Sequence, residues 1–387
     1  MGDVDRGPYQ GREQAKVKHM LLQRYIVRLF MIMGQREPVI NYVDCFAGPW
    51  QSESDDLSDT SIGIARSEML KCYEGLTARF NQRFKFRALF IEKDPKAFER
   101  LRGYVNNNTS EAVELHCLKG EFLDLVPQIA RWSGGNFTFF FVDPKGWLDV
   151  SAQKMAPLLS LPRSEFLINF MYDFANRSIA QPDKFEHHVK ELLGYVPDLS
   201  LLNPQERKLE IVNLYRAQLK TVFGEEAFSS FLPVERPGQN RTLYYMVYLS
   251  RHSSGIDAFK SEAEKTDSFQ NEMQVKAKIQ KLADRSNMGD LFGDDGVDQA
   301  SGSASRRDLI AHARQSVLSL LAERPVKVDM GVWARLLETN VCLPSDFQAA
   351  IKELTGEGLI QNMSADIGRR SAKPLAPKKM EVWKIIE

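Results

Sequence analysis

Hydrophobic residues in the first 285 positions alternate between short continuous runs and helically spaced sets. Strand-like segments occupy residues 39–44, 84–94, 113–122, 137–143, 165–171 and 242–252. Helical spacing dominates before the first of them, at 16–33, and between them, at 64–73 and 95–105. The run FTFFFVD at 137–143 is typical of a strand that is covered on both faces. This alternation predicts an α/β fold, with a parallel sheet, helices on both faces and right-handed crossovers.

Residues 286–305 interrupt the hydrophobic pattern. They read SNMGDLFGDDGVDQASGSAS, are rich in Gly, Ser and Asp, and have no apolar periodicity. We therefore expect three parts, an α/β domain at 1–285, a flexible linker at 286–305 and a second domain at 306–387. Each of the two domains is long enough to form its own core.

The pattern after residue 306 predicts three helices, a basic loop and a short strand. The helices are expected from 306 to the proline at 325, at 328–340 and at 343–360, and the strand is EVWKII. This order predicts a winged helix-turn-helix domain, whose third helix would read nucleic acid. Winged helices also dock proteins, so both uses stay open. The candidate nucleic-acid residues form the wing and are Arg369, Arg370, Lys373, Lys378 and Lys379.

Composition narrows the range of functions. The 387 residues include 51 Lys and Arg against 51 Asp and Glu, which gives a formal net charge of +0. This balance excludes binding of nucleic acid through a high overall positive charge, but it does not exclude a local basic patch. The four cysteines lie far apart with no CxxC pair, which argues against a disulfide scaffold and a four-thiolate metal site. No run is long enough to span a membrane, and the polar N-terminus does not resemble a signal peptide. We therefore expect a cytoplasmic protein.

Acidic and aromatic residues follow the predicted strands. Ligands of parallel sheets bind beyond the carboxyl ends of the strands, so these residues are candidates for a shared site. A carboxylate after the second strand suits the two hydroxyls of a ribose, and a glycine after the first strand lets a ligand approach the backbone. The candidate residues are Asp44, Phe46, Gly48, Glu92, Glu121, Asp143, Pro144, Trp147 and Asn169.

Each of these residues also has a structural interpretation. A strand-end acid often caps the backbone amides of the following turn, and Phe46 and Trp147 would ordinarily be core residues. The acids, however, follow four successive predicted strands at one edge. Like charges gathered there cost stability, and the hydroxyls and ammonium of a ligand would offset that cost. The combination therefore favours a cofactor site.

Two motifs extend this interpretation to a family. The string DCFAGPW resembles the D-x-F-A-G-x-G motif of class I S-adenosylmethionine (SAM)-dependent methyltransferases, and DPKGW resembles their D-P-P-aromatic motif. Across roughly residues 10–285, an ordered set of motifs resembles the three-Cys-motif partner protein family, TcmP. The set consists of Lys18-His19, Tyr42 to Pro49, Ile91 to Asp94, Phe140 to Trp147, Glu165 to Met171 with Arg177, and Tyr244 to His252. That resemblance implies a Rossmann-like methyltransferase sheet, SAM as cofactor, and a partner protein bearing the three-Cys motif. A winged helix like the one predicted here commonly follows TcmP-like domains.

The methyltransferase interpretation assigns roles to the candidate residues. Asp143 and the carbonyl of Pro144 would accept hydrogens from a target amine, Trp147 would stack on the base and Asn169 would orient it. Lys18 and His19 would close over the carboxylate of the cofactor. A target base within a duplex would have to be flipped out.

Two departures from the motifs keep a second hypothesis open. Trp50 stands where a small residue is usual, and Lys145 replaces the second proline or the aromatic residue. Both favour a non-catalytic scaffold that docks a cysteine-rich enzyme and presents nucleic acid to it. A dinucleotide-dependent enzyme is disfavoured, because Gly48 is followed by Pro-Trp-Gln and no G-x-G-x-x-G fingerprint is present.

Overall fold

The computed structural model describes residues 13–48, 52, 57–80, 84–239, 241–286, 300–364 and 373–386. The chain divides into two compact units, Met1–Arg251 and His252–Glu387. This division precedes helix α9 (Ser253–Ser286), whereas the sequence pattern places it at 286–305. Residues 300–305, expected in a linker, form the start of helix α10 (Ala300–Leu321). Residues 287–299 lie outside the described residues.

The first unit is built on a seven-stranded sheet with the order β3-β2-β1-β4-β5-β7-β6. Strands β1 to β5 pair in parallel, as the sequence predicts, and β7 runs antiparallel to both β5 and β6. The strands are β1 (Val39–Asp44), β2 (Lys85–Glu92), β3 (Val113–Lys119), β4 (Phe137–Val142), β5 (Ser164–Phe170), β6 (Phe228–Glu235) and β7 (Thr242–Ser250).

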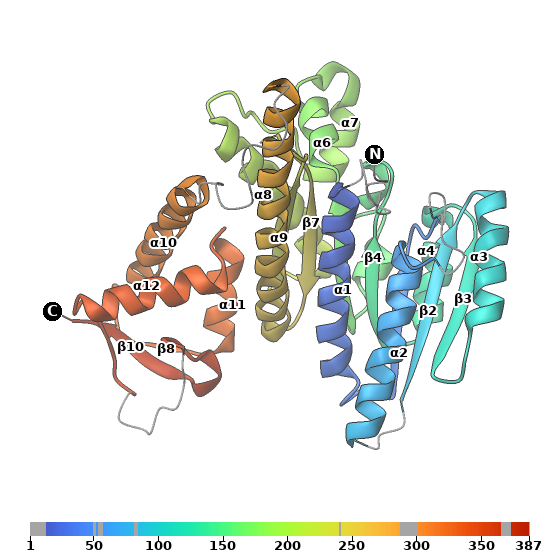
Figure 1. Ribbon diagram of the computed structural model, residues 1–387, viewed down its shortest axis with the longest axis horizontal. Helices are drawn as coiled ribbons and strands as arrows, with labels where there is room; N and C mark the ends of the chain where they lie inside the picture. The colour runs from blue at the N-terminus through green and yellow to red at the C-terminus, as the bar shows by residue number, and fades with distance from the viewer. Residues whose placement is uncertain are drawn as a thin grey trace. The chain divides into compact units, whose positions relative to one another are not determined.

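Helices cover both faces of this sheet. Helices α1 and α2 pack side by side (Figure 1). Helix α2 packs on β1 and β2, α1 contacts β6 and reaches β4 and β7 through Tyr25, and α3 packs on β2 and β3. Helices α4 to α8 contribute to the hydrophobic cluster on the opposite face. The helices are α1 (Glu13–Met33), α2 (Ser61–Phe80), α3 (Pro95–Asn108), α4 (Phe122–Ser133), α5 (Ala156–Leu159), α6 (Tyr172–Ile179), α7 (Pro182–Leu193) and α8 (Pro204–Phe223), with a single 3-10 turn η1 (Leu148–Val150).

The central strands are hydrophobic on both faces because both faces are covered. All six residues of β4 and all seven of β5 are buried. Successive side chains of a strand point to opposite faces, so Phe139 packs against Tyr25 and Tyr42, on the side of α1. Phe140 stacks on Phe166 at 4.7 Å in the cluster on the other side. The side chains of the hydrophobic run at 137–142 therefore pack into two cores, one on each face of the sheet.

Removing one of these rings tests the two-sided core. Phe140 is fully buried, and Phe140→Ala should lower the free energy of unfolding by about 3–5 kcal/mol, because it leaves a cavity beside Phe166. Chemical denaturation measures this change. The matched control is Phe80→Ala, since Phe80 is 43% exposed and its loss should change stability by less than about 0.5 kcal/mol. Equal effects of the two substitutions would contradict the described packing.

The second unit contains helices and a small antiparallel sheet with the order β8-β10-β9. From α10 onward its chain order is helix, strand, two helices and two strands, with the three predicted helices and the strand at 381–385 present. Its remaining elements are β8 (Val326–Val328), α11 (Met330–Thr339), α12 (Pro344–Gly356), β9 (Ile360–Asn362), the 3-10 turn η2 (Pro377–Lys379) and β10 (Glu381–Ile385).

Helix α9 joins the second unit through specific contacts. Lys260 is only 3% exposed, and its ammonium donates to the backbone carbonyls of Asn340 and Cys342 at 3.1 and 3.2 Å. The indole of Trp333 in α11 donates to Asp257 at 2.8 Å. A buried ammonium is costly unless it is hydrogen-bonded, so these contacts position α9 on the helices that follow it.

Candidate functional site

The strand order brings four of the predicted site residues to one edge of the sheet. Asp44 ends β1 and Glu92 ends β2, while Asp143 directly follows β4 and Asn169 lies near the end of β5. Strands β2, β1, β4 and β5 are consecutive neighbours. Asp44 is in register with Phe90 of β2 and Phe141 of β4, so the polar positions lie within two residues of one another along the edge.

Asp143 is the centre of this group. One of its carboxylate oxygens forms an ion pair with the ammonium of Lys18 on α1, and the other accepts from the side-chain amide of Asn169 at 2.7 Å. The side chains of Lys18 and Asp143 are only 15% and 19% exposed. Residues from three distant parts of the chain therefore meet at one carboxylate, and Lys18 contacts this carboxylate directly.

Asp44 is fully buried beneath the same edge. Its carboxylate accepts from the backbone N–H of Phe46 at 3.2 Å and from the hydroxyl of Ser61 at 2.6 Å. Burial nevertheless raises the pKa of Asp44 to about 7, and nearby Asp143 adds to the rise while Lys18 opposes it. Ser61 begins α2 and carries no motif, so the sequence did not mark it as a site residue.

Two buried polar atoms at this edge have no hydrogen-bond partner among the described residues. They are the side-chain oxygen of Asn169 and the hydroxyl of Tyr42. Burial holds the pKa of Tyr42 well above its usual value, and the charges of Asp44, Cys45 and Asp143 add to the effect. Most buried polar atoms in proteins are paired, so these two atoms are candidates for bonds to a ligand.

Glu92 and Glu121 have different environments. Glu92 is 3% exposed and accepts from the backbone N–H of Asp94 at 2.6 Å. Burial raises the pKa of Glu92, and the charge of Lys145 opposes this rise. Glu121 has a side chain that is 60% exposed and pairs with Lys93 at 3.2 Å. Glu92 is therefore part of the buried edge, whereas Glu121 is a surface ion pair.

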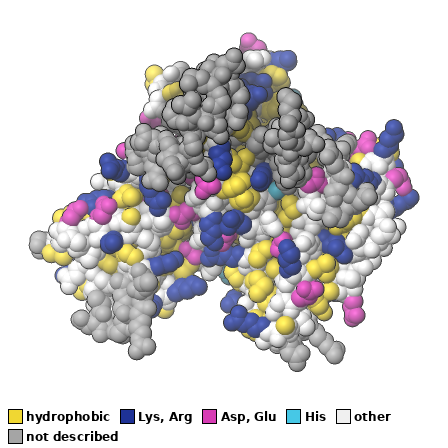
Figure 2. All heavy atoms as spheres, in the orientation of Figure 1, with side chains coloured by type: hydrophobic (Ala, Val, Ile, Leu, Met, Phe, Trp, Pro, Cys, Tyr) yellow, Lys and Arg dark blue, Asp and Glu magenta, His cyan; other side chains and the backbone are white. Residues whose placement is uncertain are grey.

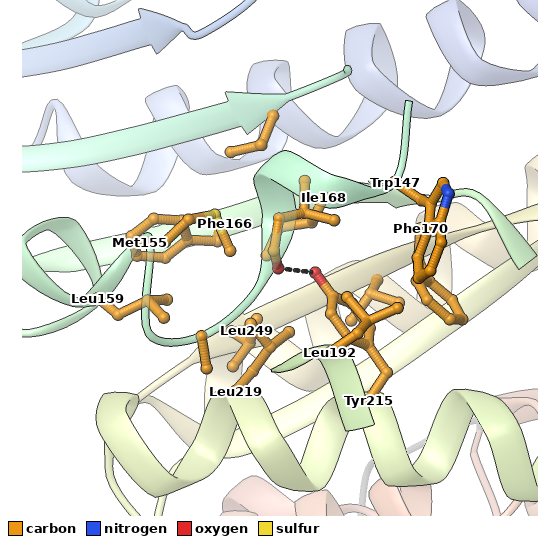
Figure 3. Close-up of a cluster of buried hydrophobic side chains, with 14 of the residues drawn as sticks. Trp147, Met155, Leu159, Phe166, Ile168, Phe170, Leu192, Tyr215, Leu219 and Leu249 are labelled. Carbon is orange, nitrogen blue, oxygen red and sulfur yellow. Dashed lines mark hydrogen bonds between the residues drawn. The ribbon is translucent and has the colours of Figure 1, made fainter. Parts of the chain in front are cut away.

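The aromatic candidates are mainly packing residues. Trp147 is 7% exposed and packs against Phe185 at 6.3 Å and His188 at 6.0 Å. Figure 3 shows it among buried hydrophobic side chains. Trp147 is therefore a packing residue in this structure, and the expectation that it stacks on a base stays a prediction. Phe46, which is half-buried, packs on Phe122 at 5.0 Å.

The remaining candidates of the first unit flank this edge. Gly48 is half-buried, and its N–H donates to the carbonyl of Phe46 at 2.9 Å in the turn after β1. Pro144 is buried, and His19 is half-buried on α1 next to Lys18. Lys145 is exposed. Trp50 lies outside the described residues.

The basic candidates of the second unit lie between β9 and β10. Lys373, Lys378 and Lys379 are exposed there, and Arg369 and Arg370 fall outside the described residues. The acidic residues of α12 are partly balanced, because Arg314 of α10 pairs with Glu353 at 3.1 Å and with Glu357 at 2.6 Å. The repulsion that these acids would exert on phosphates is therefore smaller than the sequence of α12 implies.

Comparisons with known proteins leave the function open. No protein-family model matches the chain, and no curated protein matches it. Among solved structures, the crystal structure of a Legionella pneumophila protein of the family DUF519 aligns with 66% of this chain and 92% of its own, at 8% identity and a TM-score of 0.37.

None of the described helices is long and apolar enough to cross a membrane. The described His, Cys, Asp and Glu residues form no cluster of three that could hold a metal ion.

Proposed function

We propose that the first unit is a TcmP-like, SAM-binding methyltransferase domain that acts on an amine of a nucleic-acid base or a similar amine. The observation that carries the proposal is the group of Asp44, Asp143 and Asn169 at the carboxyl edge of adjacent parallel strands, with Lys18 across it. The sheet supports the proposal, because its five adjacent parallel strands, covered by helices on both faces, fit the Rossmann-like sheet that the resemblance implies.

The residues at the edge suit the cofactor. Glu92, buried at the end of β2, would accept from the ribose hydroxyls. Asp44 would face the positively charged end of the cofactor, where a cation would offset the cost of its buried charge. The unpartnered oxygen of Asn169 and hydroxyl of Tyr42 offer further bonds. When bound, SAM supplies an activated methyl group.

The chain would contribute orientation and charge stabilisation at the target amine. Asp143 and the carbonyl of Pro144 would accept its hydrogens, which aligns the nitrogen lone pair and stabilises the positive charge that grows there. Asn169 holds one oxygen of Asp143, and Lys18 holds the other. Because Trp147 is buried, its role is to pack the turn after β4 against the core.

Calorimetric titration with SAM tests the proposed cofactor. We expect saturable binding with one site per chain, and binding should weaken in Glu92→Gln, which loses the ribose acceptor charge. Glu121→Gln is the matched control, because Glu121 is an exposed, ion-paired acid that should not affect binding. Absence of heat at about 1 mM SAM, which corresponds to less than about 4 kcal/mol of binding free energy, would exclude the cofactor.

A second candidate function is a non-catalytic scaffold. It is favoured by the ion pair of Lys18 with Asp143, which occupies the carboxylate that catalysis would use. The order of helices and strands after Ala300 supports a winged helix-turn-helix in this unit, with Lys373, Lys378 and Lys379 on the nucleic-acid side. The proposed partner is a three-Cys-motif protein. Assays with methyl-labelled SAM on DNA and RNA, with and without that partner, separate the two candidates, since a scaffold alone would transfer no label.

A further inference from the structure

An open cleft in the first unit lies near the proposed active edge. It has a volume of about 580 Å³ and is formed by α6, the start of α8 and the start of β7. Its lining includes the charged residues Asp173, Arg177, Arg207, Lys208 and Arg241, together with the amide of Asn176. Of the lining residues, only Arg177 belongs to the motifs that carry the TcmP resemblance, because the lining comes from three separated segments.

The cleft has a net positive charge, although the formal net charge of the whole chain is zero. Four of the lining residues are basic and one is acidic, so the lining carries +3, whereas the whole chain carries +0. Figure 2 shows basic and acidic side chains interspersed over the visible face of the molecule. A lining with this excess of cations is therefore a local departure from the average surface, and it favours an anionic ligand.

Internal contacts orient the basic groups. The guanidinium of Arg241 bonds both carboxylate oxygens of Asp173 at 2.7 and 2.8 Å, and Arg177 lies 3.3 Å from the same carboxylate. Arg207 donates to the neutral amide of Asn176 at 2.7 Å, so this contact leaves its charge unbalanced. The single carboxylate of Asp173 therefore pairs with two arginines, Arg177 and Arg241. Guanidinium groups held in this way can bind phosphate oxygens through paired N–H donors.

The cleft lies close to the residues that would hold the target amine. Tyr172 begins α6 only three residues after Asn169, so their Cα atoms are at most about 11 Å apart. Thr242 begins β7, and Tyr245 of that strand is in register with Phe170 at the end of β5. The cleft therefore continues the same edge of the sheet. A phosphate group bound in the cleft could therefore belong to the same polynucleotide as a base held at Asp143.

We propose that this cleft binds the phosphate backbone of a polynucleotide, next to the base that is presented to Asp143. The inference rests on the proposed function and specifies its substrate class. Phe174 is 42% exposed and lies beneath the guanidinium of Arg177 at 4.7 Å from its ring centroid, beside the cleft. Exposed aromatic rings beside basic groups are typical of single-strand binding surfaces, which favours a nucleic acid over an acidic protein segment.

Fluorescence anisotropy with the full chain and labelled single-stranded DNA and RNA of about 16 nucleotides tests the proposal. The variant is Arg207→Gln with Lys208→Gln. We expect its affinity to fall about tenfold at moderate salt, with a shallower dependence on salt, because two phosphate contacts are lost. The control is Arg36→Gln with Arg79→Gln, since these exposed residues flank the opposite edge of the sheet and should leave affinity unchanged.

Several outcomes would overturn the inference. These are an unchanged affinity in the cleft variant, an equal loss in the control, or equally effective competition by polyglutamate or by a mononucleotide. If the double variant does not fold, Lys208→Gln alone carries the test, with about a threefold loss expected for one contact. SAM calorimetry on the same variants separates the two proposals. If the cleft variant binds both SAM and the oligonucleotide normally, only the cleft proposal is excluded. If the unaltered chain does not bind SAM, the proposed function is excluded.

Discussion

Asp143→Asn is expected to reduce methyl transfer by at least about a hundredfold while SAM still binds. Asparagine keeps the shape of the side chain but removes the negative charge that would stabilise the amine as it becomes positive, an effect worth about 3–4 kcal/mol in comparable sites. It also removes the ion-pair partner of Lys18, whose side chain is only 15% exposed. Single-turnover transfer of labelled methyl, together with calorimetry, measures both quantities.

The matched control for this substitution is Asp149→Asn. Asp149 lies six residues further along the chain in η1 and is half-buried, so its replacement should leave methyl transfer unchanged. Full activity of Asp143→Asn would exclude the proposed role of the carboxylate, whereas an unaltered chain that transfers no methyl group would leave the scaffold function. A parallel loss of SAM binding would show instead that Asp143 and Lys18 act mainly on the cofactor.

Asp44→Asn is expected to stabilise the protein above pH 7 and to weaken SAM binding. Burial raises the pKa of Asp44 from its usual 3.8 to about 7, so the folded chain binds a proton more tightly than the unfolded chain. The stabilisation from this proton is complete below pH 4 and is lost as the pH rises to 7. The difference corresponds to about 4 kcal/mol, and asparagine avoids it because it does not titrate.

Chemical denaturation of both proteins between pH 4 and 8 measures this effect. The variant should gain stability relative to the unaltered chain as the pH rises, with no further gain above about pH 8. Glu121→Gln, at an exposed ion pair, should show a change below about 1 kcal/mol. A difference that does not depend on pH would contradict the cost of burying Asp44.

The same variant should bind SAM about tenfold more weakly. A hydrogen bond to a charged group contributes about 1.5–3 kcal/mol, so loss of the charge at Asp44 removes a substantial part of the binding free energy. A carboxylate that lowers stability at neutral pH is understandable if a ligand uses its charge. Greater stability with unchanged SAM affinity would make Asp44 a structural residue only.

The hydrophobic pattern predicted the parallel sheet because its strands are buried on both faces. Runs such as 137–142 leave no alternative to a covered strand, and the structure buries all six residues. The pattern did not predict β6, and it did not predict β8 and β9, which have three residues each. Segments this short carry too few positions for a period to appear.

The limits of the two units show the same contrast. Residues 286–305 have the composition of a linker, yet 300–305 extend α10, because a helix once formed can continue through residues with no apolar periodicity. Helix α9 groups with the second unit through Lys260 and Trp333, which contact residues far away in the chain. The sequence around α9 does not predict these contacts, because the contacting residues are distant in the chain.

The sequence by itself determined the chemical types at the strand ends, since Asp44, Glu92, Asp143 and Asn169 follow hydrophobic runs that can only be strands. Only the tertiary structure decided their contacts. It paired Lys18 with Asp143, buried Trp147, left Glu121 at the surface and gathered the basic cleft from α6, α8 and β7. The physical reason is that the type and period of residues act locally, whereas burial and charge pairing depend on segments that meet only when the sheet assembles.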